Sequence, residues 1–340
     1  MDAHDLPYPV VDSHAHLGVP AAEALLADRP ELAAERAEEQ SAHSAYSLQV
    51  NRAQLGRLVP LMADPEQRLA DMDAMGVDVQ VVGPMPMHHY WADEGLAAEF
   101  ARATNEGVAA HRAHHPDRLM GLATVPLQHV DLAIAELTHA VENLGLAGAS
   151  VSTQVAGREL AHPAHEDFWA AAEELGVPVF IHPWGCSLGT RLASNYLGNT
   201  VGQPVETTVA LSHLIFSGLL DRRRELRLVA AHGGGYLPTY IGRSDHAWSV
   251  RADARGCVAP PSAYLSRLWY DALVYTPAGL AHLVAAVGPG RVVLGTDYPF
   301  DMGVDDPVQR IMAAVDVPAD ERVAICGSNA FSLFKGIGKH

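Results

Sequence analysis

The sequence predicts an α/β protein built on a (β/α)8 barrel. Short apolar runs bounded by turn residues alternate with segments of helical period, and this strand-then-helix pattern occurs eight times in 340 residues. Three of the runs, VPVFIH, LRLVAAH and RVVLGTD, are almost continuously apolar, as expected of parallel strands that are buried on both faces. Such a barrel needs about 250 residues, so roughly ninety residues remain for insertions.

Strands and helices are expected to alternate along most of the chain. The expected strands are Tyr8–His16, Val77–Val82, Met120–Val125, Ala147–Ser152, Val177–His182, Leu226–His232, Trp269–Val274 and Val292–Asp297. Helical period is found in Pro65–Met75, Glu94–His115, Asp131–Leu144, Pro163–Leu175, Val205–Leu220, Pro277–Val287 and Ala319–Phe334. Eight β-α units of this kind are typical of a TIM barrel.

The remaining residues are assigned to two insertions within a single domain that spans residues 1–340. The first covers about 18–64, after the first strand, and its Ala/Glu-rich part at 21–40 is expected to be a surface helix. The second, 183–203, follows the fifth strand and contains Gly, Ser, Thr and Asn without helical period. Because the loops that follow barrel strands lie at the catalytic face, the second insertion is expected to overhang the site.

The composition excludes several classes of function. Lys and Arg number 23 against 40 Asp and Glu, and the resulting net charge of −17 repels nucleic-acid phosphates and anionic lipid. No apolar run reaches the ~18 residues of a membrane span, and the first residues lack the basic and apolar segments of a signal peptide. The three cysteines are far apart and show no C-x-x-C spacing, so a reducing cytoplasm is the expected location.

Lysine chemistry inside the fold is excluded as well. The only two lysines are Lys335 and Lys339, both near the end of the chain. Schiff-base catalysis, attachment of pyridoxal phosphate and a carbamylated lysine that bridges two metals all need a lysine within the fold. We therefore expect neither pyridoxal phosphate nor a lysine-bridged pair of metals. A site with one metal ion and no organic cofactor is the expectation for this chain.

Polar residues that end the apolar strands indicate a metal site. His14 and His16 form an H-x-H motif in the first strand, where residues two apart project to the same face. His182 ends the fifth strand and Asp297 ends the eighth. We expect these four residues to bind one divalent ion, zinc first and manganese second, because imidazole and carboxylate suit such ions. The alternative, four hydrogen-bonded core residues at one barrel end, is costly without a metal.

His232 ends the sixth strand and is expected to have a catalytic role beside the metal. A neutral imidazole near its own pKa can pass a proton to and from a water molecule at the ion, although His232 could instead be a fifth ligand. Asp297 is assigned to catalysis as well as to the ligand set. The three glycines that follow His232 suggest a close backbone approach to a ligand or an oxyanion hole, but no G-x-S-x-G motif supplies an esterase nucleophile.

The chain resembles the decarboxylase branch of the amidohydrolase superfamily, and within it the α-amino-β-carboxymuconate-ε-semialdehyde decarboxylase family. The motifs that carry the resemblance are DSHAH, DMDAMGVDVQ, VPLQ, HPWG, PVETTVALSHLIFSG, HGGG, GRSDHAW, PPSAYL and VVLGTDYPF, spread over nearly the full length. The resemblance implies zinc ligands at His14, His16, His182 and Asp297, and a catalytic histidine at His232. It also implies a small carboxylate as substrate.

The resemblance further implies two arginines that bind the carboxylates of the substrate. One falls on Arg243, which the partner subunit of a homodimer would contribute. The other falls near Arg57, one residue out of the expected register, and the neighbouring Arg52 could take its place. For each position a surface ion pair is the alternative, yet a planar guanidinium suits bidentate carboxylate binding in a chain of acidic charge.

The sequence departs from the family pattern around the expected pocket. Gly185 replaces an acidic residue after Trp184, and Tyr196 stands where an aromatic gate is expected as tryptophan. Trp184 and Tyr196 are assigned to substrate binding. His88 and His89, which also differ from the family, are interpreted as a surface pair.

Other residues are assigned to the hydrophobic core. Five methionines are expected there, and the list is Met62, Met72, Met75, Met85 and Met87. His213, within an apolar helix, is interpreted as a core histidine.

Together these features predict a metal-dependent, cofactor-free decarboxylase of a small unsaturated or aromatic carboxylic acid. One alternative is a hydrolase or hydratase that uses the same single-metal site to attack a lactone, an amide or an activated double bond. A second alternative is a barrel that binds a ligand or a partner without catalysis. The complete set of four ligands with His232 argues against the second.

Overall fold

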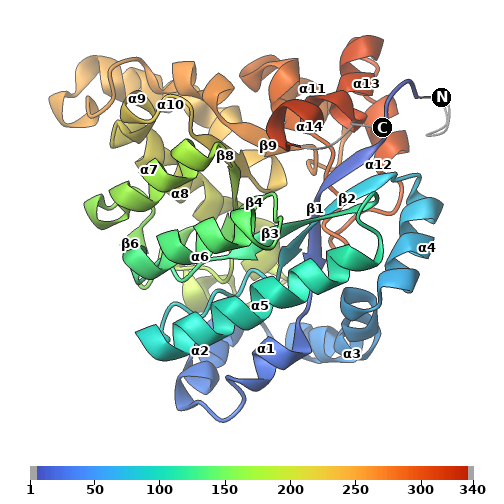
Figure 1. Ribbon diagram of the computed structural model, residues 1–340. Helices are drawn as coiled ribbons and strands as arrows, with labels where there is room; N and C mark the ends of the chain where they lie inside the picture. The colour runs from blue at the N-terminus through green and yellow to red at the C-terminus, as the bar shows by residue number, and fades with distance from the viewer. Residues whose placement is uncertain (1–5, 336–340) are drawn as a thin grey trace.

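A computed structural model describes residues 6–335 and confirms the barrel. Eight parallel strands follow one another in the order β1-β2-β3-β4-β7-β8-β9-β10, and helices surround them (Figure 1). The strands are β1 (Val11–Leu17), β2 (Val79–Pro84), β3 (Leu119–Thr124), β4 (Gly148–Val151), β7 (Pro178–Ile181), β8 (Arg227–Ala230), β9 (Trp269–Asp271) and β10 (Val292–Val293). A short antiparallel hairpin, β5 (Gln154–Val155) with β6 (Arg158–Glu159), follows β4.

The strands are apolar on both faces because each face packs against a different part of the core. In β7, Phe180 packs with Val11, Val229 and the other residues of a small central cluster. Its neighbour Val179 belongs to the large cluster that includes residues of the surrounding helices. This explains why the runs in the sequence are continuous rather than alternating.

The expected outer helices lie close to their expected ranges, and two further helices, in residues 237–250 and 307–312, form where none was expected. They are α4 (Pro65–Met75), α5 (Glu94–His114), α6 (Val130–Glu142), α7 (Glu166–Leu175), α8 (Gln203–Phe216), α9 (Leu219–Arg222), α10 (Leu237–Val250), α11 (Pro277–Val287), α12 (Pro307–Met312), α13 (Ala319–Cys326) and α14 (Ser328–Leu333). Asp64 caps α4 by accepting hydrogen bonds from the backbone of Glu66 and Gln67. No helix among residues 6–335 combines the length and apolar character needed to cross a membrane.

Two of the expected helices are each divided in the structure. The segment expected from Val205 to Leu220 is broken at Gly218, which has a left-handed backbone with φ of 70°. The segment expected from Ala319 to Phe334 is broken at Gly327, where a Cβ atom would lie 2.2 Å from the carbonyl oxygen of Pro9. Helical period is the same on both sides of each break, so the pattern alone does not reveal it.

Three helices lie between β1 and α4, in the region assigned to the first insertion. They are α1 (Pro20–Ala24), α2 (Pro30–Gln40) and α3 (Ala45–Ala63). Gln54 on α3 donates a hydrogen bond of 2.9 Å to Asp301, which lies in the loop after β10. On α2, Glu35 lies 2.6 Å from Nδ1 of His89. The insertion is thus tied to two loops at the carboxyl end of the barrel.

The interpretation of His88 and His89 as a surface pair is wrong. Both are buried, with 5% and 2% of their surface exposed. Nδ1 of His88 lies 2.9 Å from Oγ1 of Thr124, and burial lowers the pKa of His88 to about 3. The loop after β2 that carries both rings is covered, and His89 bonds to Glu35 of α2.

The carboxyl ends of β1 and β10 are joined by a buried polar network. Asp12 accepts hydrogen bonds from the backbone of His14 and Thr296 at 3.0 Å each, from Oγ1 of Thr296 at 2.6 Å and from Gln80 at 2.8 Å. Burial raises the pKa of Asp12 to about 6, against these hydrogen bonds, which lower it. Arg68 of α4 donates to Gln80 and to the carbonyl oxygen of His16, both at 2.7 Å. The network fixes the backbone around His14 and His16 and around Thr296, the residue before Asp297.

Arg68→Met should therefore destabilise the protein strongly. The substitution leaves two buried acceptors unpaired, on Gln80 and His16, and each costs about 1 to 3 kcal/mol, so a loss of about 2 to 6 kcal/mol is expected. Urea unfolding measures it. Arg224→Met, at an exposed arginine, is the control and should change stability by less than about 0.5 kcal/mol. Equal effects of the two substitutions would show that the network contributes nothing.

Candidate metal centre

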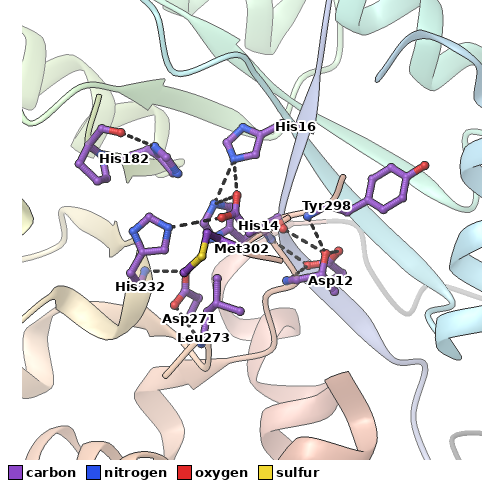
Figure 2. Close-up of polar contacts among 12 residues, drawn as sticks. Asp12, His14, His16, His182, His232, Asp271, Leu273, Tyr298 and Met302 are labelled. Atoms are coloured by element: carbon purple, nitrogen blue, oxygen red, sulfur yellow. Dashed lines mark hydrogen bonds and ion pairs between the residues drawn. The ribbon is translucent and has the colours of Figure 1, made fainter. Parts of the chain in front are cut away.

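The structure brings the four expected histidines together at the carboxyl end of the barrel (Figure 2), and the expected aspartate, Asp297, lies against three of them. His14 and His16 extend from β1, His182 follows β7, His232 follows β8 and Asp297 follows β10. The carboxylate of Asp297 lies among the rings: its Oδ1 is 3.0 Å from Nε2 of His16 and 3.4 Å from Nε2 of His14. Its Oδ2 is 3.7 Å from Nε2 of His232.

Hydrogen bonds on the outer nitrogens orient the inner nitrogens toward the centre. Nδ1 of His14 donates to Asp271 at 2.7 Å, and Nδ1 of His182 donates to the carbonyl oxygen of Pro183 at 2.8 Å. With the protons on Nδ1, both rings direct the lone pair of Nε2 inward. Nε2 of His182 is buried and has no hydrogen-bond partner among the described residues.

These orientations fit a bound cation. Nε2 of His14 and Nε2 of His16 are only 3.2 Å apart, which is unfavourable for two lone pairs unless a positive charge lies beside them. His14, His182, His232 and Asp297 form a group whose ligand atoms all lie within 4.8 Å of one another. This donor set of imidazole nitrogens and one carboxylate suits zinc or a similar divalent ion.

The geometric group differs in one member from the expected ligand set, because it contains His232 in place of His16. His16 nevertheless contacts both Asp297 and His14 through Nε2. The two rings differ in exposure: the His232 side chain is 12% exposed and that of His16 only 4%. Of these two histidines, His232 is therefore the more open to solvent.

The charges of the site depend on this packing. Burial alone would raise the pKa of Asp297, but the neighbouring rings of His14, His16 and His232 outweigh it and hold the pKa well below its usual value. Burial, reinforced by the neighbouring rings of His16 and His14, lowers the pKa of His182 well below its usual value. An ionised carboxylate and a neutral imidazole are the forms that bind a metal.

Sharp turns after β8 and β10 direct His232 and Asp297 toward the centre of the site. His232 and Asp297 both have left-handed backbones, with φ of 54° and 59°. Gly233 to Gly235 also have positive φ, and a Cβ on Gly235 would lie 2.2 Å from the carbonyl oxygen of Pro204 at the start of α8. The run of three glycines thus allows close packing within the protein, in addition to any approach to a ligand that the sequence suggested.

A cavity of about 510 Å³ lies over the centre and includes His182 and Asp297 in its lining. Its other walls come mainly from the insertion and from the loops after β2, β7 and β10, and the apolar side chains among them are Leu48, Leu55, Leu58, Met85, Met87, Trp184, Tyr196, Phe300 and Met302. A cavity of this size accepts one aromatic ring with its substituents. A larger cavity, of about 940 Å³, contains none of the metal-centre residues.

The predicted substrate-binding residues lie in different places. Trp184 and Tyr196 line the cavity. Both arginines considered on α3 are exposed, but only Arg52 is part of the cavity lining. Arg243, on α10, is also exposed and outside this cavity, so within one subunit it does not join the site.

Several residues at the site were missed or misassigned. Asp271 was missed, although a carboxylate within the apolar strand WYD was a usable signal. Met85 and Met87, expected in the core, are only half-buried and line the cavity. Away from the site, His213 was also expected in the core, but its side chain is 53% exposed.

The comparisons with known proteins agree with this geometry. The amidohydrolase family model matches residues 11–336. A 2-amino-3-carboxymuconate-6-semialdehyde decarboxylase of Dictyostelium discoideum is 35% identical over 273 residues, which are 79% of this chain and 76% of the relative. A gamma-resorcylate decarboxylase of Rhizobium radiobacter is 31% identical over 293 residues, covering 81% of this chain and 88% of that protein.

A solved structure extends the comparison to three dimensions. The crystal structure of a 2,6-dihydroxybenzoate decarboxylase complexed with 2,6-dihydroxybenzoate matches with a TM-score of 0.81 and 26% identity, and the match covers 96% of this chain and 99% of that one. Family, relatives and fold agree with one another, and the expected resemblance is confirmed. The chain belongs to the decarboxylases of the amidohydrolase family and is a carboxy-lyase.

Proposed function

We propose that this carboxy-lyase is metal-dependent, uses no organic cofactor and removes CO2 from a small aromatic or unsaturated carboxylic acid. The observation that carries the proposal is the convergence of histidine rings and the Asp297 carboxylate beneath the 510 Å³ cavity. The rings are those of His14, His16 and His182. His14, His16, His182 and Asp297 would hold one divalent ion, zinc or manganese. When bound, the ion supplies a positive charge that polarises an oxygen of the substrate and so provides an electron sink for C–C cleavage.

The cavity supports a small, conjugated acid as the substrate. Its apolar walls, among them Trp184, Tyr196 and Phe300, suit the face of a ring or a planar unsaturated chain. Arg52 is the arginine of α3 that can bind a carboxylate there, since it lines the cavity. A guanidinium at this point offsets the acidity of the chain, whose net charge is −17.

His232 and Asp297 carry the proton transfer. His232 is more exposed than His16, and its Nε2 lies 3.7 Å from a carboxylate oxygen of Asp297, so the two groups face the same point of the site. His232 donates its proton to the carbon that bears the carboxylate. The bond from that carbon to the carboxylate then breaks, its electron pair returns to the conjugated system and CO2 leaves.

The proposal extends to the assembly and its location. Arg243 lies outside the cavity of its own subunit, and in a homodimer it would reach the site of the partner. A cytoplasmic location agrees with the three widely spaced cysteines, all of which are free. Neither nucleic acid nor a membrane is a partner of so acidic a chain.

Labelled water distinguishes decarboxylation from hydrolysis, because only hydrolysis or hydration adds oxygen from water to the product. A panel of dihydroxybenzoates and conjugated dicarboxylic semialdehydes in ¹⁸O-labelled water should give CO2 and a product that lacks one carboxylate and contains no added oxygen from water. Mass spectrometry of the product and CO2 detection measure this. A product with ¹⁸O at a new hydroxyl or carboxyl group, formed without CO2, would favour the hydrolase or hydratase.

Removal of the metal should abolish activity reversibly. We expect a strong chelator to remove one equivalent of ion, and Zn²⁺ or Mn²⁺ to restore the rate, because the electron sink depends on the bound charge. His182→Ala should bind the ion far more weakly, whereas His213→Ala, at a side chain that is 53% exposed, should bind it as the wild type does. Full activity in chelated, metal-free protein would refute metal dependence.

The two arginines of α3 give a matched comparison. Arg52→Met should raise KM by roughly 10- to 150-fold, because a hydrogen bond to a charged group contributes about 1.5 to 3 kcal/mol. Arg57→Met, five residues along the same helix and outside the cavity lining, should leave KM nearly unchanged. Steady-state kinetics with the best substrate of the panel decide between them, and the reverse order of effects would assign the role to Arg57.

A further inference from the structure

Asp271, the last residue of β9, is fully buried beside the metal centre and has no part in the chemistry described above. We propose that Asp271 is the positioning residue of the site: one carboxylate fixes the orientation and tautomer of His14 and also the turn that presents His232. The role of His232 in this inference rests on the proposed function, whereas the role of His14 concerns the binding of the metal alone.

The carboxylate of Asp271 accepts four hydrogen bonds, which fill both of its oxygens (Figure 2). Oδ2 accepts from Nδ1 of His14 at 2.7 Å and from the backbone nitrogen of His232 at 2.8 Å. Oδ1 accepts from the backbone nitrogens of Gly233 at 2.8 Å and Leu273 at 3.2 Å. Three of these donors belong to other parts of the barrel, namely β1 and the turn after β8. Asp271 therefore does more than end its own strand.

Only a carboxylate satisfies this set of donors. All four partners are N–H groups, so both positions must be acceptors. The amide of asparagine has one oxygen and one NH2 group. Whichever way it turned, its NH2 group would face either the donors of His14 and His232 or those of Gly233 and Leu273.

The turn at His232 depends on the negative charge of this side chain. His232 and Gly233 are consecutive residues with left-handed backbones, with φ of 54° and 61°. Successive N–H groups in such a turn point the same way and form a concave site for an anion, which here is the carboxylate of Asp271. A left-handed histidine is unfavourable by itself, so the turn needs such a contact to persist.

The fold leaves room for Asp271 and His14 to approach each other. Gly295, after β10, passes both residues so closely that a Cβ atom there would lie 2.9 Å from the Cβ of Asp271 and 2.9 Å from the Cβ of His14. The absence of a side chain at this position permits the 2.7 Å contact between the two.

The carboxylate of Asp271 thus positions two distinct side chains, those of His14 and His232. Since the proton of His14 is held on Nδ1, Nε2 keeps its lone pair toward the ion. Since the same carboxylate holds the backbone of His232, the rings of His14 and His232 keep a fixed separation, with centroids 5.3 Å apart. The place of the ion and the place of the proton donor are therefore set together.

The test is Asp271→Asn in the full-length, metal-loaded protein. Metal affinity, measured by competition with a chromophoric chelator, should fall about 10- to 100-fold. At saturating metal, kcat should still be at least tenfold below that of the wild type while KM changes little, because His232 remains misplaced. The control is Glu136→Gln, which replaces a buried carboxylate that binds Arg102 on the outer helices and should change neither quantity.

Each outcome decides part of the proposal. Unchanged metal affinity in Asp271→Asn would overturn the role toward His14, and full recovery of kcat at saturating metal would overturn the role toward His232. If the variant does not fold, the wild type labelled with ¹⁵N-histidine provides the answer. In metal-free protein, NMR should show a proton on Nδ1 of His14. Comparison with the His14→Asn variant assigns the signal. An unprotonated Nδ1 would overturn the proposal.

The affinity and NMR measurements need no substrate. If no acid is decarboxylated, the proposed function fails while the position of His14 is still tested. If decarboxylation is found but the metal affinity of Asp271→Asn is normal, the positioning role fails while the function stands.

Discussion

The site depends on the hydrogen bonds that close the barrel. The backbone nitrogens of Thr296 and Asp297 both donate to the carbonyl oxygen of His14, and Asp12 accepts from the backbone and the hydroxyl of Thr296. These bonds join the first strand to the segment after the last one, residues almost 300 positions apart in the chain. A carboxylate and two imidazoles from opposite ends of the sequence meet only because this junction forms.

The parts of the site that follow strand geometry could be predicted from the sequence. His14 and His16 are two residues apart in a strand and therefore share a face, and His182, His232 and Asp297 each end an apolar run. In a parallel barrel all such ends lie on one rim, so their meeting requires no knowledge of individual contacts. The eight strands were predictable for the same reason, since burial on both faces leaves a simple apolar pattern.

The parts that depend on loops and on the insertion could not be predicted in the same way. The pattern of α3 does not say which face covers the cavity, so it could not decide between Arg52 and Arg57. His88 and His89 resembled a surface pair because the residues they contact, Thr124 and Glu35, lie far from them in the chain. Asp271 was visible as an acidic residue in a strand, but its four donors come from three segments that only the fold brings together.

The insertion and the barrel contribute separately to the site. The barrel strands and the loops that directly follow them supply the cluster of histidines and Asp297, whereas α2 and α3 supply much of the roof of the cavity and contact the barrel loops through Glu35 and Gln54. Mutations in the roof can therefore reshape the space for the acid and leave the reacting groups where they are. Selectivity in such a protein can drift during evolution at little cost to the reaction itself.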